Sequence, residues 1–119
     1  YGFDDALYAG ARLLEIIAAS TESCADIFAA LPDSVNTPEI KIPVADSEKF
    51  ALMQALVDAA HFASAKDVNT IDGLRVNFSE GWGLVRPSNT SPYLVMRFEA
   101  SNESVLNQIQ EIFREWILS

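Results

Sequence analysis

The segment RPSNTSP at residues 86–92 gathers the side-chain types that proteins use to hold an anion. Its arginine offers N–H donors in a rigid fork that suits phosphate or carboxylate, and its hydroxyls and amide can bond the remaining oxygens. Pro87 and Pro92 fix their own φ and limit the freedom of the segment. We therefore predict an anion-binding loop. The alternative is a polar hairpin loop whose Ser and Asn side chains bond their own backbone.

The chain as a whole is acidic, so positive charge for such a loop must be local. Seventeen Asp and Glu residues against eight Lys and Arg give the 119 residues a formal net charge of -9. This charge disfavours nucleic acid and anionic membranes as partners. Arg75, Arg86 and Arg97 place basic side chains within and around the loop. With no apolar run of about 18 residues and no basic-then-apolar leader, we predict a cytoplasmic protein with no membrane partner.

Cys24 and His61, the single cysteine and the single histidine, give little support for catalysis. One cysteine excludes an internal disulfide and favours a reducing compartment, and we expect Cys24 to be a buried small apolar residue. His61 falls near the end of a predicted helix, where its charge would complement the helix dipole. Asp4 and Asp5 suit the start of a helix better than a metal site. We predict no catalytic residue and no metal ligand in this chain.

Two helices and a turn-rich stretch make up the first third of the chain. We expect a helix over residues 4–19, apolar on several sides, and a shorter one over 22–31 capped by Thr21. A helix apolar on several sides packs between two partners, so we expect a bare apolar face where one partner lies outside the chain. Residues 32–38 are rich in Pro and turn residues, and we predict a hinge between two domains there.

From residue 39 onward the predicted order is strand, helix, four strands, helix. An antiparallel sheet with both helices on one face is the economical packing, which gives an α+β fold. Asp72-Gly73 predicts a two-residue hairpin turn with positive φ. The expected elements are an edge strand over 39–44, a helix that Asp46 caps and that ends between His61 and Ala65, strands over 68–71, 74–78, 82–86 and 93–99, and a helix over 102–118 capped by Ser101 or Asn102. The expected buried stripes are Phe50, Met53, Val57 and Ala60 in the first of these helices and Val105, Ile109, Ile112, Phe113 and Trp116 in the second.

Gly81-Trp82-Gly83 matches part of a dinucleotide-binding motif but lacks its third glycine and its following helix. We therefore expect Gly81 to be a turn residue and Trp82 to be a core or partly covered aromatic residue.

Three stretches, DGLRV at 72–76, GWGLVRPSNTSP at 81–92 and LVMRFE at 94–99, carry a resemblance to a known family. They resemble the C-terminal, fourth domain of the α-D-phosphohexomutases, and in particular the bacterial phosphomannomutase/phosphoglucomutase branch. YGFDDALY and RLLE near the start look like the last helix of the third domain. The resemblance thus implies three parts: residues 1–31 from the third domain, a hinge at 32–38, and a phosphate-binding domain at 39–119.

The resemblance implies an isomerase that transfers a phosphoryl group between the 1- and 6-positions of mannose or glucose phosphates. In this family a phosphoserine of the first domain forms a bisphosphorylated sugar, the second domain holds magnesium, and the fourth domain holds the phosphate that is not transferred. We expect this chain to lack the phosphoserine and magnesium loops and to be inactive alone, without a cofactor of its own. The implied partners are the phosphosugar substrate and the other domains of the parent protein.

The phosphate-holding loop of the family falls on Arg86, Pro87, Ser88, Asn89 and Thr90. By this resemblance Arg86 pairs with phosphate oxygens, Ser88 and Thr90 donate hydroxyls, Asn89 donates an amide or backbone N–H, and Pro87 shapes the loop. These roles agree with the donor types present in the segment.

Arg97 matches a further basic position of the family, where either a phosphate contact or a structural ion pair would fit. Asn89 departs from the glucosamine and animal glucose branches, which generally have glycine at this position, and Ser91 departs from the glucosamine branch, which generally has glutamate there. The alternative function is a free-standing module that binds an anion or a partner protein. A bare apolar helix near the N-terminus favours the mutase domain, and a start codon immediately before Tyr1 would favour the module.

Overall fold

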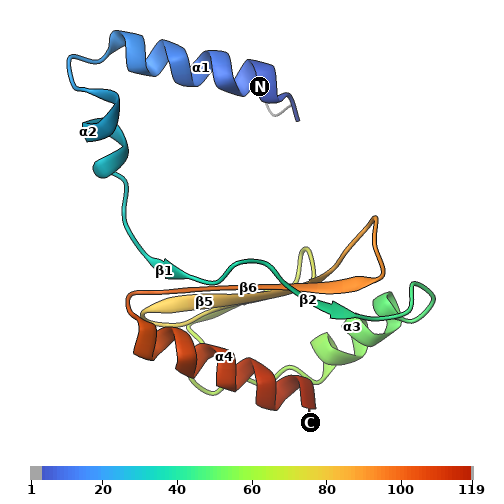
Figure 1. Cartoon of the computed structure of the whole chain (residues 1–119). Coiled ribbons are helices and arrows are strands. Elements are labelled where there is room, and N and C mark those ends of the chain that lie inside the picture. The colour runs from blue at the N-terminus through green and yellow to red at the C-terminus, as the bar shows by residue number, and fades with distance from the viewer. Residues whose placement is uncertain (1–3, 119) are drawn as a thin grey trace. The chain divides into compact units, whose positions relative to one another are not determined.

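The computed structural model describes residues 4–118, which fall into two compact units that divide after Asp33 (Figure 1). The first unit contains α1 (Ala6–Ala19) and α2 (Cys24–Ala29). α1 begins after Asp5, whose carboxylate accepts the backbone N–H of Tyr8 at 2.9 Å. The helix predicted over residues 4–19 is therefore confirmed, with Asp5 as its cap.

α2 is shorter than predicted, and a different residue caps it. Ser23 Oγ accepts the backbone N–H of Asp26 at 3.2 Å and donates to the Asp26 carboxylate at 2.5 Å. Because Ser23 satisfies this N–H, the helix starts at Cys24. The predicted second helix is therefore confirmed, but its bounds of 22–31 and its cap, Thr21, are wrong. Cys24 is exposed rather than buried, since it lies in the first turn of a helix whose described residues are all unburied.

α1 carries an exposed apolar surface. None of the described residues of α1 is buried, and Leu7, Leu14 and Ile16 are 88%, 67% and 57% exposed. Exposed apolar area of this kind marks a surface that another protein segment covers. The predicted bare face is therefore confirmed, and its covering by a neighbouring domain stays a prediction.

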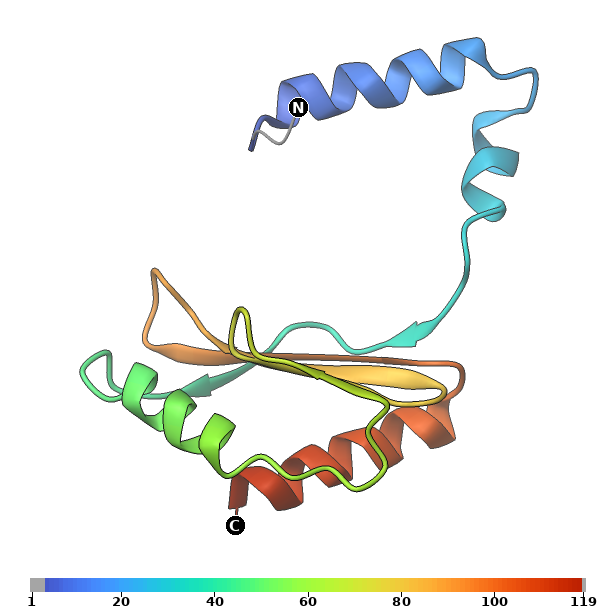
Figure 2. The same cartoon turned by 180° about the vertical axis from the view of Figure 1, so that it is seen from behind.

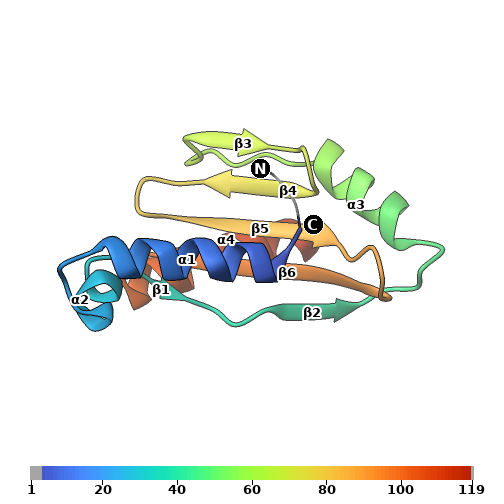
Figure 3. The same ribbon diagram turned by 90° about the horizontal axis from the view of Figure 1, so that it is seen from above.

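The second unit is an antiparallel six-stranded sheet with α3 (Lys49–Asp58) and α4 (Glu103–Leu118) on one face (Figures 1 and 2). The strands are β1 (Val35–Asn36), β2 (Ile40–Pro43), β3 (Asp67–Asn69), β4 (Leu74–Asn77), β5 (Gly81–Pro87) and β6 (Tyr93–Ala100). Their order is β1–β6–β5–β4–β3, and β2 pairs with β6 beside β1 (Figure 3). This confirms the predicted α+β fold and adds β1, which the sequence did not predict.

β1 lies within residues 32–38, the segment predicted to be a hinge. It pairs with β6, and the next residue, Thr37, continues the pairing: its N–H donates to the Phe98 carbonyl at 3.0 Å, and its hydroxyl accepts the Phe98 N–H at 3.1 Å. A motion that keeps the sheet intact must therefore occur before Val35. The hinge itself stays a prediction.

The β3–β4 connection is longer than the predicted two-residue turn. β3 ends at Asn69 and β4 begins at Leu74, so residues 70–73 connect the strands. Asn69 Oδ1 accepts the Ile71 N–H at 2.9 Å, which turns the chain before the Asp-Gly pair is reached. Gly73 has a φ of 75°, whereas Asp72 does not take the positive φ that the predicted turn requires, so that prediction is wrong.

α3 buries a narrower stripe than predicted. Met53 is 4% exposed, but Phe50, which we expected in the core, is 55% exposed. A turn over residues 45–48 separates Asp46 from the start of the helix. Among the described residues no side chain caps α3, and Asp46, the predicted cap, instead accepts a hydrogen bond from the Lys49 ammonium at 2.7 Å.

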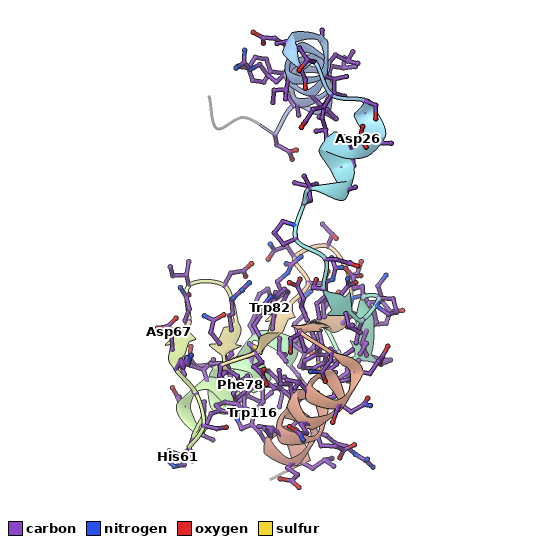
Figure 4. The ribbon with its side chains drawn as sticks, turned by 90° about the vertical axis from the view of Figure 1, so that its left-hand side faces the viewer. Asp26, His61, Asp67, Phe78, Trp82 and Trp116 are labelled. Atoms are coloured by element: carbon purple, nitrogen blue, oxygen red, sulfur yellow. The ribbon has the colours of Figure 1, made fainter. Side chains whose placement is uncertain are left out.

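α3 also ends before the predicted region at residues 61–65. The Ala60 N–H donates to the Val57 carbonyl at 3.1 Å, a tight final turn that stops the helix. His61 therefore lies beyond the helix, exposed in the following loop (Figure 4), and its predicted pairing with the helix dipole is wrong.

Aromatic rings fill the space between α4 and the sheet. Phe113 is 1% exposed, and its ring meets Phe98 edge-on at 5.1 Å between centroids and lies 5.6 Å from Trp116. Asn102, one of the two predicted caps, begins α4 by accepting the Val105 N–H at 3.1 Å. Of the predicted stripe, Ile109, Phe113 and Trp116 are buried and Val105 and Ile112 are half-buried, while Leu106 is a buried residue that the prediction missed.

Gly81 and Gly83 in β5 let α4 approach the sheet closely. A Cβ at Gly81 would lie 2.7 Å from Ile109 Cδ1, and one at Gly83 would lie 2.6 Å from Phe113 Cζ. Such distances leave no room for a side chain at either position. Gly81 is therefore a strand residue at a close approach, and its predicted role in a turn is wrong.

Gly83→Ala is expected to lower the free energy of unfolding by about 1–3 kcal/mol, because the added methyl group displaces the Phe113 ring. Urea unfolding followed by circular dichroism measures the change. Gly10→Ala is the matched control, since nothing lies within 4 Å of a Cβ at this position of α1 and alanine is the better helix former. Equal stability of Gly83→Ala and the unsubstituted chain would contradict the packing described above.

Candidate anion-binding site

Basic side chains gather on the face of the sheet opposite α3 and α4, which we call the open face. Side chains alternate between the two faces along a strand, and the core residues Leu74, Val85 and Phe98 mark the helix side of β4, β5 and β6. Arg75, Arg86 and Arg97 therefore share the open face. Figure 4 shows Trp82 on this face and Trp116 on the helix side.

The predicted loop connects β5 to β6 and rises from the open face, on the side of the sheet opposite α3 and α4 (Figures 1 and 2). The Ser88 N–H donates to the Tyr93 carbonyl at 2.9 Å, and the Tyr93 N–H donates to the Ser91 carbonyl at 2.8 Å. These two bonds close the base of the loop, so residues 89–91 form its tip.

A hollow of about 240 Å³ lies beside the loop, and we call it the loop hollow. It brings together Arg86, Ser88 and Thr90, three of the five residues predicted to hold phosphate. Its full lining is Glu39, Lys41, Arg86, Ser88, Thr90, Ser91, Tyr93 and Val95. The other two predicted residues do not line it: Pro87 is buried on the helix side, and Asn89 is exposed at the loop tip.

Lys41 is a cation of the loop hollow that the sequence analysis missed. In the sheet Val95 pairs with Lys41 on one side and with Arg86 on the other, so the two cations flank it on the open face. The Lys41 ammonium lies 3.4 Å from a Glu39 carboxylate oxygen and 5.9 Å from the centroid of the Tyr93 ring. The alternation of Lys41 with Ile40 and Ile42 placed it on the open face, but its distance from Arg86 depends on the pairing of β2 with β6.

Arg86 lies at the wall of the loop hollow with its side chain 35% exposed. Its Nη1 lies 3.9 Å from Asp72 Oδ2, a long contact with a carboxylate that is 66% exposed, which adds little to stability. The turn before β4 packs on the Arg86 backbone, because a Cβ at Gly73 would come within 2.6 Å of Arg86 Cα. The backbone of Arg86 is therefore held in place, and its guanidinium keeps N–H donors for a partner that binds it more strongly than Asp72 does.

The polar side chains of the loop form no hydrogen bonds within the described part of the chain, residues 4–118. This holds for the hydroxyls of Ser88, Thr90 and Ser91 and for the amide of Asn89. Elsewhere in the molecule such side chains do bond nearby backbone N–H groups, as those of Asp5, Ser20, Ser23, Asn69 and Asn102 show. The alternative of loop side chains satisfied by their own backbone is therefore wrong.

Arg97 and Arg75 lie on the open face but outside the loop hollow. Arg97 is exposed opposite Leu84, and among the described residues no carboxylate forms an ion pair with it. The structural ion pair that we offered as its alternative role is thus not formed here. Arg75 lies 4.1 Å from the centroid of the Trp82 ring, so Trp82 is the partly covered aromatic that was expected.

Other classes of site find less support in residues 4–118. Within this range no three His, Cys, Asp or Glu side chains come together in a way that could hold a metal ion. The magnesium that the family resemblance implies is expected in the second domain of the parent protein, and its binding stays a prediction. No helix within the same range is long and apolar enough to cross a membrane.

The fold and the loop define a small α+β domain with a basic open face and a hollow lined by arginine, lysine and hydroxyl groups. Residues 39–115 match the family described as phosphoglucomutase/phosphomannomutase, C-terminal domain. The chain belongs to this family.

Known relatives and a solved structure agree with this assignment. The chain is 48% identical over 118 residues to a phosphomannomutase/phosphoglucomutase of Pseudomonas putida, covering 99% of this chain and 25% of that protein. It is 46% identical to a phosphoglucomutase of Neisseria gonorrhoeae, covering 100% of this chain and 26% of the relative. A crystal structure of a phosphoglucomutase/phosphomannomutase family protein from Burkholderia thailandensis superposes with a TM-score of 0.83 at 44% identity, covering 98% and 24% of the two chains. The chain thus spans about a quarter of the length of these proteins.

Proposed function

We propose that this chain is the phosphate-binding domain of a phosphohexomutase that interconverts the 1- and 6-phosphates of mannose or glucose. The names of its relatives support the activity of the whole protein. The role of this domain rests on one observation: Arg86, Lys41 and hydroxyls with no internal hydrogen bond surround the loop hollow. The phosphoserine, the bisphosphorylated intermediate and the magnesium belong to the proposal for the whole protein, as do its cytoplasmic location and its other domains.

The loop hollow offers a phosphate group both charge and directed donors. Arg86 provides a planar fork that bonds two phosphate oxygens at once, and Lys41 adds a second positive charge from the other side of Val95. Ser88 and Thr90 donate hydroxyls to the remaining oxygens. Asn89 lies outside the hollow, so we assign its contact to the backbone N–H at the loop tip.

Carboxylates now beside the two cations would give way to phosphate. Asp72 lies 3.9 Å from Arg86 and Glu39 lies 3.4 Å from Lys41, and both carboxylates are substantially exposed. A phosphate dianion forms shorter and stronger charge-assisted hydrogen bonds than these pairs. Binding therefore exchanges two weak solvent-screened contacts for direct bonds to the ligand.

Holding the phosphate that is not transferred would fix one end of the sugar while the other end reacts. This is catalysis by positioning, so the loop needs no proton transfer of its own. Arg97, on the same face, is the candidate for an outer contact. A hinge before Val35 would let the domain close over the substrate and exclude water.

Titration of the isotope-labelled 119-residue chain with glucose 1,6-bisphosphate tests the proposal by NMR. We expect amide shifts confined to Arg86, residues 88–91 and Lys41, with an affinity on the order of millimolar because one loop contributes part of an enclosing site. Glucose without phosphate is the control and should shift none of them. A coupled mutase assay on the same sample should show no turnover. Shifts elsewhere on the sheet, or none at the loop, would refute the assignment.

A further inference from the structure

Lys49 is a buried charged residue at the first position of α3. It is 3% exposed, and it is one of two polar or charged residues among those described that are buried. A lysine at a helix N-terminus faces the positive end of the helix dipole, which is unfavourable. Burial of its ammonium is also unfavourable unless hydrogen bonds replace the lost water. The helix alone therefore gives no reason for a lysine at this position.

The partners of Lys49 lead from α3 to the loop. Its ammonium donates to Asp46 Oδ1 at 2.7 Å and to the Ser91 carbonyl at 3.0 Å, and it lies 5.2 Å from the centroid of the Phe50 ring. Asp46 is close in sequence and its side chain is 68% exposed. The bond to Ser91 spans 42 residues and reaches a residue that lines the loop hollow.

Ser91 fixes the C-terminal end of the loop, the end that leads into β6. Its carbonyl accepts two hydrogen bonds, one from Lys49 and one from the Tyr93 N–H at 2.8 Å. The Val44 N–H holds the next carbonyl, that of Pro92, at 3.0 Å, and the Ser88 N–H fixes the near side. Residues 89 and 90 are left between these anchors.

We propose that Lys49 is a positioning residue that holds the anion-binding loop from behind through the Ser91 carbonyl. Lys49 does not line the loop hollow, so it acts on the ligand through the loop. With this bond in place, the loop is already ordered before the ligand arrives. Ligand binding therefore does not include the entropy cost of ordering the loop. The effect on affinity rests on the function proposed above, whereas the effect on loop order does not.

Lys49→Met, which keeps the length and the apolar stem but removes the donors, tests the inference. Hydrogen exchange of the Tyr93 amide should become roughly tenfold faster, because its acceptor loses its second anchor. The dissociation constant for glucose 1,6-bisphosphate should rise roughly tenfold, as for loss of one charge-assisted bond in a site. Exchange in the middle of β6, at Phe98, should not change, which separates loop opening from a general loss of stability.

Two further variants complete the test. Lys49→Arg keeps a charged donor and should restore most of the Tyr93 protection, while Lys66→Met removes an exposed lysine and should leave both measurements unchanged. If Lys49→Met does not fold, Asp46→Asn neutralises the carboxylate that accepts from the same ammonium and should give a smaller change in the same direction. Unchanged Tyr93 exchange in the folded variant would overturn the inference. Failure of the unsubstituted chain to bind the bisphosphate would instead overturn the proposed function alone.

Discussion

Replacing Arg86 with alanine in the proposed full-length mutase is expected to lower kcat/KM by roughly a hundredfold, the equivalent of about 3 kcal/mol. The side chain is 35% exposed in the chain, and its contact with Asp72 is long. Its removal therefore changes the folded protein little, and the loss falls on the bonds to phosphate. Under the proposed function the non-transferred phosphate is held before and during the reaction, so most of the effect should appear as a higher KM.

Two further variants serve as controls for the Arg86 experiment. Arg86→Lys keeps the charge but loses the planar fork, and should recover only part of the loss. Arg114→Ala removes an exposed arginine of α4 that pairs with Glu111 at 3.6 Å, and should leave the kinetics unchanged. Steady-state kinetics with mannose 1-phosphate and glucose 1-phosphate measure all three. If Arg86→Ala retains normal kcat and KM, the loop hollow does not bind the substrate phosphate.

Replacing Phe113 with alanine is expected to lower the free energy of unfolding of the sheet unit by about 3–5 kcal/mol. The ring is 1% exposed and packs between Phe98, Phe62 and Trp116, and it covers Gly83. Removing it leaves a cavity where α4 packs on Gly83 of β5. Because neighbouring rings hold each other in place, the cavity has little freedom to collapse.

Tryptophan fluorescence during urea unfolding measures this loss specifically. Both tryptophans of the chain, Trp82 and Trp116, belong to the sheet unit, so the signal does not report on α1 or α2. Phe50→Ala is the matched control, because the same ring type is 55% exposed there, and it should cost about 1 kcal/mol or less. Equal losses at the two positions would contradict the core assignment.

Helix α4 and the long strands could be predicted because their signals agree over many residues. The buried positions Ile109, Phe113 and Trp116 repeat on a helical period, and β6 alternates between the core and the open face. Errors arose where one local signal competes with another. Ser23 displaces Thr21 as a cap, and Asn69 turns the chain before the Asp-Gly pair.

In the candidate site, too, some residues could be predicted from a local pattern and others could not. Arg86, Ser88 and Thr90 lie within five positions of sequence, so their meeting in one loop followed from the loop itself. Lys41 and Lys49 lie far from it along the chain. Their approach depends on β2 pairing with β6 and on α3 packing behind the loop, and neither is encoded in a local pattern.

Within residues 4–118, the hydrogen bonds that tie residues 88–91 to the rest of the domain all use backbone atoms of these four residues. The side chains of the loop can therefore change during evolution without affecting the folding of the domain. Substitutions there remove no internal hydrogen bond and open no cavity, so the free energy of unfolding should tolerate them. Mutations that retune the choice of anion can therefore accumulate in the loop without a compensating change in the core. Substitutions at Lys49 or Gly73 are not tolerated in the same way, because Lys49 bonds the Ser91 carbonyl and Gly73 packs on the Arg86 backbone.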